Sequence, residues 1–329
     1  MTLHNRLIRG LVGIAVAAVG LVAAAPSSAQ VYPDKPIRLV VTFAAGGSSD
    51  VLARAVAKAM SDGLKTPFVI DNRPGAGGVV GMEAVANAAP DGYTILFATN
   101  GTHGIGPALY PNRKVDPVKN LAPVGMLHTL TNVLLVNPAV PAHTVAELIA
   151  YAKANPGKLN FASAGNGSAS HLFGELFKSA AGIDIVHVPY KGGSSAMPDL
   201  LAGNVSMMLE TIPNALAQMR GGKLRALGVT SAKRSAAAPE IPTLAESGLP
   251  GFDASSWTGL SAPLGTPKAI IDMLNAETQR IAKDPAYLET LKSLGTDAAS
   301  STPQGFDSIM RNDIAKWTEV VRRANLKAD

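Results

Sequence analysis

The chain alternates between short apolar runs and longer stretches in which apolar residues recur with helical spacing. Val, Ile, Leu and Phe dominate the short runs, which predict strands at residues 37–43, 68–71, 94–98, 123–127, 132–136, 159–162, 185–189, 206–210 and 226–230. Helical spacing is clearest at residues 51–60, 145–153 and 270–283. Strands that alternate with helices are typical of an α/β fold, so we expect sheets whose strands are mostly parallel.

The last part of the chain predicts one long amphipathic helix. Thr302 suits the N-cap and Pro303 suits the first helical position. Beyond them, apolar residues recur at helical spacing, namely Phe306, Ile309, Ile314, Trp317 and Val321. We expect this helix to pack back onto the body of the protein.

Residues 1–30 have the composition of a secretory signal peptide. Arg6 and Arg9 form a basic region, residues 11–25 are an unbroken apolar run, and residues 26–30 supply the small side chains of a cleavage site. The apolar run is shorter than the roughly 20 residues that a membrane-spanning helix needs. We therefore expect export, removal of residues 1–30 and a periplasmic mature protein.

Composition narrows the possible chemistry. The sequence has no cysteine, which excludes disulfides, a cysteine nucleophile and thiolate metal ligands. Its 47% hydrophobic and 16% charged residues indicate a globular protein with a large core. The formal net charge of +5 falls to +3 when Arg6 and Arg9 leave with the signal peptide. Because the remaining basic residues are scattered, we expect no nucleic-acid partner.

Three turns rich in glycine and serine follow predicted strands and lead into predicted helices. The first turn lies in FAAGGSSDVLAR (residues 43–54), the second in NFASAGNGSASHL (160–172) and the third in HVPYKGGSSAMPDLLAGNV (187–205). Helix N-termini attract anions, and ligands of open α/β sheets gather beyond the carboxyl ends of the strands. The pattern therefore predicts an anion site made of backbone amides. We expect Asp50 to cap its own helix and to order the first turn.

The sequence lacks the motifs of common catalytic sites. It contains no G-x-x-x-x-G-K-[ST], G-x-G-x-x-G, G-x-S-x-G or H-E-x-x-H stretch, and its histidines do not pair at metal-ligand spacing. We therefore expect no cofactor, no metal and no catalytic residue, and we interpret His103 and His171 as structural groups. An exported serine hydrolase remains an alternative, in which Ser48 or Ser168 would act with one of these histidines.

Taken in order, these stretches resemble the periplasmic solute-binding proteins of tripartite tricarboxylate transporters, the Bug family. The resemblance runs from about residue 32 to the C-terminus and rests on YPDKPIRLVVTFAAGGSSDVLAR, VIDNRPGAGGVVGMEAVANAAPDGYTILFATNGTHG, NFASAGNGSASHL, HVPYKGGSSAMPDLLAGNV and SSWTGLSAPLGTP. It implies a two-lobed periplasmic binding protein type II fold with a ligand cleft between the lobes. Lobe one would comprise residues 31–128 and 252–329, and lobe two residues 129–251.

The resemblance also implies which residues bind the ligand. In this family the cleft holds a carboxylate through backbone amides and small hydroxyl side chains of facing turns. Carried over to this chain, the implied ligand-binding residues are Ala45, Gly46, Gly47, Ser48, Ser49, Asp50, Thr99, Asn100, Thr102, Ser163, Ala164, Gly165, Asn166, Gly167, Ser168, Ser170, Tyr190, Lys191 and Asp199. Glu210 stands where the family more often has Asp, which leaves its role open. Trp257 either packs between the lobes or lines the cleft.

The implied function is capture of a small carboxylate by closure of two lobes and its delivery to the membrane permease subunits of the transporter. We expect a monomer that is not an enzyme. A binding protein that serves a sensor kinase remains an alternative. The sequence does not name the carboxylate, because di- and tricarboxylates, acidic amino acids and aromatic acids are all carried by similar proteins.

Overall fold

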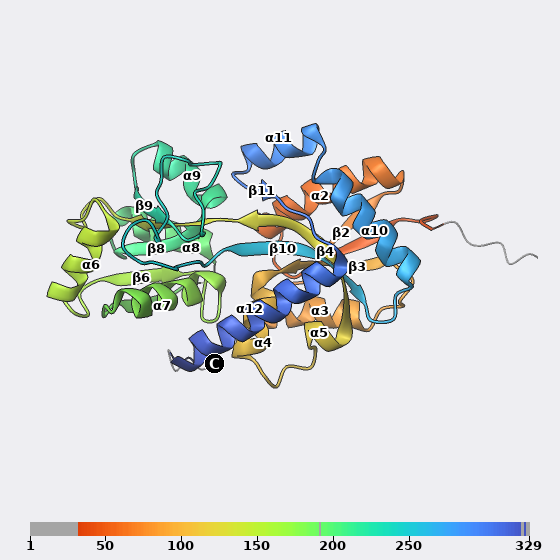
Figure 1. Ribbon diagram of the computed structural model, residues 1–329, viewed down its shortest axis with the longest axis horizontal. Coiled ribbons are helices and arrows are strands. Elements are labelled where there is room, and N and C mark those ends of the chain that lie inside the picture. The colour runs from red at the N-terminus through yellow and green to blue at the C-terminus, as the bar shows by residue number, and fades with distance from the viewer. Residues whose placement is uncertain (1–31, 191, 324–325, 327–329) are drawn as a thin grey trace, which may run out of the picture. The chain divides into compact units, whose positions relative to one another are not determined.

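The computed structural model describes residues 32–190, 192–323 and 326, and its helices and strands belong to a unit formed by residues 35–329. The predicted signal peptide lies outside the described residues. Two β-sheets organise the unit, and helices pack against both (Figure 1). No helix among the described residues is long and apolar enough to span a membrane.

The first sheet has six strands in the order β11-β4-β10-β3-β1-β2. Their bounds are β1 (Ile37–Val41), β2 (Phe68–Asn72), β3 (Thr94–Thr99), β4 (Leu121–Leu130), β10 (Ser256–Pro263) and β11 (Asp297–Ala298). β1 is parallel to β2 and β3, so the carboxyl ends of these three strands lie at one edge of the sheet. The first turn follows β1 at this edge.

The second sheet has five strands in the order β7-β6-β8-β5-β9. Their bounds are β5 (Asn132–Val136), β6 (Asn160–Ser163), β7 (Val186–Pro189), β8 (Met207–Thr211) and β9 (Arg225–Val229). β6 is parallel to β7 and β8, so these three strands also end at a common edge. The second turn follows β6 there, and the third turn follows β7.

Helices connect the strands in both sheets. Their bounds are α2 (Ser48–Leu64), α3 (Val79–Ala86), α4 (Gly106–Leu109), α5 (Pro117–Asn120), α6 (Val145–Ala154), α7 (Ala169–Ala181), α8 (Gly193–Ala202), α9 (Ile212–Arg220), α10 (Lys268–Ile281), α11 (Pro285–Ser293) and α12 (Pro303–Arg323). A 3-10 turn, η1 (Ala76–Gly78), precedes α3, and a π-helical turn, η2 (Gly101–Ile105), follows β3.

The chain passes between the sheets twice. β4 ends at Leu130 in the first sheet and β5 begins at Asn132 in the second, whereas residues 230–255 lead from β9 back to β10. The chain thus forms two α/β lobes, one around each sheet. The residue limits of the two lobes stay a prediction.

The expectation of mostly parallel strands was wrong. Every predicted strand is present with small shifts at its ends, but β10 and the two-residue β11 were missed. β10 is antiparallel to both β3 and β4 at the centre of the first sheet. β5 is likewise antiparallel to its neighbours β8 and β9. Small and polar residues interrupt β10 because α12 packs closely on it: a Cβ atom at Gly259 would lie 2.4 Å from Cζ of Phe306. The strand therefore carries no continuous apolar run.

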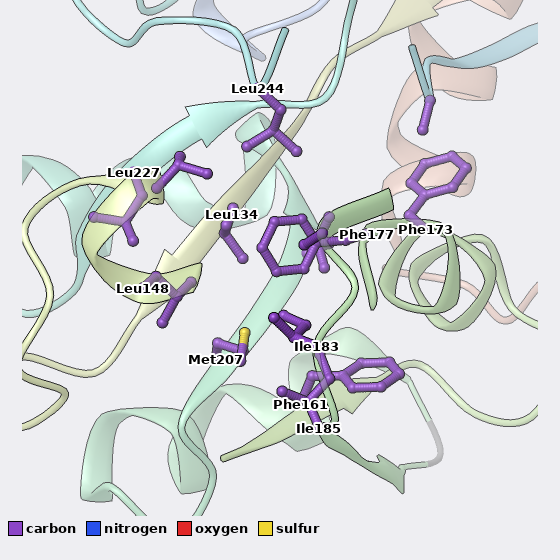
Figure 2. Packing of buried hydrophobic residues seen from close by; sticks show 14 of the residues in the cluster. Leu134, Leu148, Phe161, Phe173, Phe177, Ile183, Ile185, Met207, Leu227 and Leu244 are labelled. Carbon is purple, nitrogen blue, oxygen red and sulfur yellow. The ribbon is translucent and has the colours of Figure 1, made fainter. Parts of the chain in front are cut away.

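The main core of the second sheet packs aromatic and aliphatic side chains from β5, β6 and β8 against α6 and α7 (Figure 2). Leu134, Phe161 and Met207 come from the strands, and Leu148 and Phe177 come from the helices. All five are fully buried. The rigid edge of this sheet is what positions the second and third turns.

The predicted C-terminal helix is confirmed, and it contacts the cores of both sheets. Oγ1 of Thr302 accepts the amide of Gly305 at 3.0 Å and so caps α12. Phe306 packs with Trp257 of β10, whereas Trp317 stacks on Phe173 of α7 with ring centroids 5.3 Å apart. The helix thus packs back onto the body, as expected, and its second half reaches the core of the second sheet.

Candidate functional site

The first turn is an exposed connection between β1 and α2. Residues 44–47 are all exposed, and Gly46 has a φ of +82°, a left-handed conformation that glycine adopts without strain. Gly47 is the N-cap of α2, and no side chain caps this helix. The turn therefore presents backbone rather than side chains at the start of a 17-residue helix.

Asp50, the third residue of α2, orders the first turn, which precedes this helix. Its Oδ2 accepts the Gly46 amide and Nε of Arg54, each at 3.0 Å, and its Oδ1 accepts Nδ2 of Asn72 at 3.0 Å. Burial alone would raise the pKa of this carboxyl, but the three hydrogen bonds outweigh it and lower the pKa. The expectation that Asp50 orders the turn is confirmed. The expectation that it caps α2 was wrong, because its acceptor oxygens face Gly46, which lies before the helix.

The amides that follow Gly46 stay open. Among the described residues, no hydrogen bond uses the backbone N–H of Gly47, Ser48 or Ser49. The first amides of an α-helix have no partner within the helix and lie at the positive end of its dipole. The first turn can therefore donate to an anion from α2.

The second turn uses its own amides internally. The amide of Ala164 donates to Oγ of Ser170 at 2.9 Å, that of Gly165 to Oγ of Ser163 at 3.0 Å, and that of Ser168 to the Gly165 carbonyl at 3.1 Å. Oγ of Ser168 caps α7 by accepting the amide of His171 at 3.3 Å. At the start of α7, no hydrogen bond among the described residues uses the amides of Ala169 and Ser170.

Two stacked histidines hold the second turn in place through hydrogen bonds to Gly167 and Ser163. The imidazoles of His171 and His187 lie 3.8 Å apart and nearly parallel. Nδ1 of His171 accepts the Gly167 amide at 3.0 Å, and Nε2 of His187 lies 2.6 Å from Oγ of Ser163. Burial lowers the pKa of both rings, and that of His187 falls to about 4 with a further contribution from the neighbouring His171. Both rings are therefore neutral near pH 7, which keeps Nδ1 of His171 an acceptor.

Thr99 ends β3, and Thr99, Asn100 and Thr102 are buried in a hydrogen-bonded cluster at that end of the strand. The hydroxyls of Thr99 and Thr102 lie 3.2 Å apart, and Thr102 Oγ1 lies 2.8 Å from Nδ1 of His103. Asn100 donates its side-chain amide to Asp313 of α12. Thr102 and His103 have no exposed surface. Burial lowers the pKa of His103 to about 3, which agrees with its interpretation as a structural group.

Trp257 belongs to the same cluster at the start of β10. Its Nε1 donates to Oδ2 of Asp313, and its ring packs edge-on against Phe306 with centroids 5.2 Å apart. With 5% of its surface exposed, Trp257 packs in the interior. Burial raises the pKa of Asp313 although these donors oppose the shift.

The third turn is held by a tyrosine and an aspartate. Tyr190 donates its hydroxyl to Oδ2 of Asp199 at 2.6 Å, and Asn204 donates to Oδ1 at 2.9 Å. The bond to Asp199 raises the pKa of Tyr190 to about 12 and lowers that of Asp199. Lys191 lies outside the described residues.

The structure thus brings the predicted residues together in two groups. The second and third turns share the carboxyl edge of the second sheet, where the amide of Tyr190 donates to the Ser163 carbonyl at 3.1 Å. The first turn and the Thr99–Thr102 cluster share the carboxyl edge of the first sheet. Gly167 of the second turn approaches Tyr110, which ends α4. Among the described residues, no hydrogen bond joins the first turn to the second.

A family profile described as "Tripartite tricarboxylate transporter family receptor" matches residues 52–326. The chain belongs to this family. It is also 39% identical over 318 residues to Protein BugT of Bordetella pertussis, a match that covers 96% of this chain and 97% of that protein.

Solved structures of the family share the fold. One, "R. palustris Rpa4515 with adipate", matches with a TM-score of 0.83 and 34% identity over 90% of this chain and 99% of its own. The periplasmic binding protein BugD matches with a TM-score of 0.80 and 36% identity over 91% and 100%. MatC from Rhodopseudomonas palustris, solved with bound malate, matches with a TM-score of 0.78 and 34% identity over 88% and 100%. Like its family, the chain is a periplasmic solute-binding protein of the Bug type.

The hydrolase alternative finds no support in the geometry of this family member. Oγ of Ser168 contacts Ser170 and the backbone of His171, not an imidazole. A serine–histidine pair does exist between Ser163 and His187, but Ser163 is fully buried. The chain belongs to a family of substrate-binding proteins.

The sequence interpretation missed how the histidines support the second turn. Gly167 and His171 are four residues apart across a helix start, a spacing that can place the ring beneath the turn, and this was the available signal. The pairing of Ser163 with His187 spans two strands and left no local signal. Surface hollows on α10 and beside α3 are lined by none of the predicted site residues.

Proposed function

We propose that this protein captures a small carboxylate between lobe one (residues 31–128 and 252–329) and lobe two (residues 129–251). The ligand carboxylate accepts the amides of Gly47, Ser48 and Ser49 on lobe one. The observation that carries the proposal is the set of open amides at the start of α2, in an exposed turn that Asp50 keeps ordered. Bound adipate and malate in two related structures agree with a carboxylate ligand.

The amides of Ala169 and Ser170 complete the site from lobe two. Each charge-assisted hydrogen bond contributes about 1.5–3 kcal/mol, so five together contribute roughly 7.5–15 kcal/mol. A dissociation constant of about 1 μM corresponds to about 8 kcal/mol. Three hydrogen bonds from the first turn alone would leave little free energy to offset the costs of lobe closure and desolvation. Five hydrogen bonds can offset these costs and still give binding in the micromolar range. Asp50 in lobe one and Ser163, Ser168 and Ser170 in lobe two hold the backbone that carries these amides.

A thermal-shift screen of small carboxylates tests the proposal, because a ligand that binds only the folded state raises the melting temperature. The parent should respond to at least one carboxylate. Gly47→Val should lose that response, since its side chain covers the amides beside it, while the matched control Ala236→Val, in an exposed part of the connection between β9 and β10, should keep it. A full response in Gly47→Val, or no response of the parent to any carboxylate, would overturn the proposal.

The partner in this proposal is the pair of membrane permease subunits of a tripartite tricarboxylate transporter, to which the closed protein delivers its ligand as a monomer. Support comes from the family, whose receptors serve such transporters. Uptake of labelled ligand into vesicles that contain the permease should require the parent protein and should be lost with Gly47→Val. Light scattering of the ligand-loaded protein should give the mass of one chain.

A further inference from the structure

Glu210 lies at the edge of the second sheet that carries the second and third turns. It is the fourth residue of β8, and the neighbouring strand β6 runs parallel to β8 with Ala162 opposite Met208. Continuing this register places Glu210 level with Ala164, where the second turn begins. The side chain lies on the face of the sheet that α8 covers, because Met208, two residues earlier, packs with Ala196 of α8.

The two carboxyl oxygens of Glu210 have different surroundings. Oε1 accepts the amide of Thr211 at 2.7 Å, its hydroxyl at 3.0 Å and Nδ2 of Asn214 at 3.3 Å. No hydrogen bond from a described residue reaches Oε2, although the side chain as a whole is only 7% exposed. Oε2 is not among the fully buried side-chain oxygens that lack a partner, so it keeps some access to solvent and can accept a hydrogen bond from water or from a ligand.

A glycine makes room for this oxygen at the start of α8. A Cβ atom at Gly193, the first residue of α8, would lie 2.0 Å from Oε2 and 3.1 Å from Cδ of Glu210. The Gly193 backbone is not left-handed, so conformational freedom does not explain why the residue is glycine. Glycine is explained by the space that the carboxyl group of Glu210 needs. Burial also raises the pKa of Glu210 against its three donors, which shows that the protein compensates the charge incompletely.

We propose that Oε2 of Glu210 accepts a hydrogen bond from a hydroxyl or ammonium group of the bound ligand. The inference rests on the proposed function and adds a ligand class: carboxylates that carry such a donor, in preference to carboxylates that lack one. The amides of α2 hold the carboxylate of the ligand, and Glu210 holds its donor.

The edge of the second sheet fits this division of roles. Four amides of the second turn already donate within the protein, to Ser170, Ser163, His171 and Gly165. An open acceptor beside the turn therefore selects a part of the ligand that donates. Sites that hydrogen-bond a donor discriminate strongly against analogues without it, because the buried acceptor is then left unpaired.

Isothermal titration with matched ligands tests the inference. The panel contains, for chain lengths of four, five and six carbons, the plain dicarboxylate, its 2-hydroxy form and its 2-amino form, beginning with succinate, malate and aspartate. At the length that binds best, the parent should bind a donor-bearing form at least about tenfold more tightly than the plain dicarboxylate. Glu210→Gln should reduce that ratio to within about threefold for the 2-amino form. The glutamine side chain has no negative charge to attract the ligand ammonium, and in one of its two orientations it turns its own NH2 group toward that ammonium.

Two further variants keep the result interpretable. Gly193→Ala displaces the carboxyl of Glu210 without removing it and should reduce the ratio as Glu210→Gln does. Glu240→Gln makes the same change of charge at an exposed position and should leave the ratio at the parent value. A cooperative melting transition of each ligand-free variant verifies that it is folded.

The outcomes separate the two proposals. A parent that binds plain and donor-bearing forms equally, or a ratio that survives in Glu210→Gln and Gly193→Ala, overturns the role of Glu210 and leaves carboxylate capture intact. Absence of binding across the whole panel overturns both.

Discussion

In the first turn a single acid, Asp50, holds the backbone and the amides beyond Gly46 remain open; in the second turn serine hydroxyls and an imidazole take up the amides of the loop itself. Both turns follow a parallel strand, both contain two glycines, and both begin a long helix. Residues 44–47 of the first turn are exposed, whereas Ser163 and Ser170 of the second are buried.

A glycine- and serine-rich turn at a helix start therefore does not by itself make an anion site. What matters is whether nearby side chains already accept the amides. The first turn keeps the amides after Gly46 available because the side-chain acceptor beside it, Asp50, reaches back to Gly46. The second turn is built for rigidity, and α7 adds only its first two amides. Lobe one is therefore the side that grips the carboxylate in our proposal.

Valine at corresponding glycines should reveal this contrast most strongly. Gly165 has a φ of +125° and a Cβ atom there would lie 2.9 Å from the Tyr190 carbonyl, so Gly165→Val combines backbone strain with a clash and should cost about 3–4 kcal/mol of unfolding free energy. Gly47 has an extended backbone with a nearest contact of 3.6 Å, and Gly47→Val should cost less than about 1 kcal/mol. Urea denaturation of both variants measures the difference, and similar losses would contradict it.

Removal of the acceptor in each turn gives the next largest effect. Asp50→Ala removes the carboxyl that accepts from Gly46, Arg54 and Asn72 and should cost about 2–3 kcal/mol. Ser170→Ala removes the acceptor of one amide, that of Ala164, and should cost about 1 kcal/mol. The same denaturation experiment applies, with Asp50→Asn as an intermediate control. A larger loss in Ser170→Ala would mean that the first turn is not organised by Asp50.

The two turns should also lose stability in different pH ranges. Because the pKa of His187 is about 4 in the folded protein and about 6.5 when unfolded, the unfolded chain binds more protons between these values, and stability falls as pH falls through this range. His171 acts in the same direction. Asp50, whose pKa is lowered, keeps its contribution down to its ordinary value of 3.8 and loses it below.

A double variant isolates the histidine effect. Between pH 6.5 and 4 the parent should lose about 1–2 kcal/mol more than His171→Gln/His187→Gln, measured by denaturation at each pH. His103 and His128, whose pKa values are also lowered, are present in both proteins and cancel in the difference. Parallel pH profiles of parent and variant would show that the histidines do not hold the second turn.

Local pattern predicted much of this molecule. The strands, the start of α12 at Pro303 and the places of all three turns follow from periodicity, capping residues and glycine spacing. The pattern did not predict β10. Glycine is required at position 259 because the ring of Phe306, 47 positions further along the chain, packs against it, and residues near it in the sequence give no sign of this contact. The partnership of Ser163 with His187 and the space that Gly193 leaves for Glu210 are likewise set by distant residues. Sequence therefore located the turns, and tertiary contacts decided which amides stay open.

The smallest expected effect tests the contrast within the first turn itself. Gly47→Ser places a hydroxyl at the N-cap of α2, where the backbone φ of −80° and ψ of 169° suit a capping serine. Serine should stabilise the protein by a few tenths of a kcal/mol relative to glycine. The hydroxyl would accept the amide of Asp50, the third residue of α2, as Oγ of Ser168 accepts that of His171, the third residue of α7. The amides of Ser48 and Ser49 stay open, so the melting temperature of the ligand-free protein should rise slightly while carboxylate affinity stays near the parent value. A large loss of affinity in Gly47→Ser would mean that the ligand depends on the amide of Asp50 and not on those that precede it.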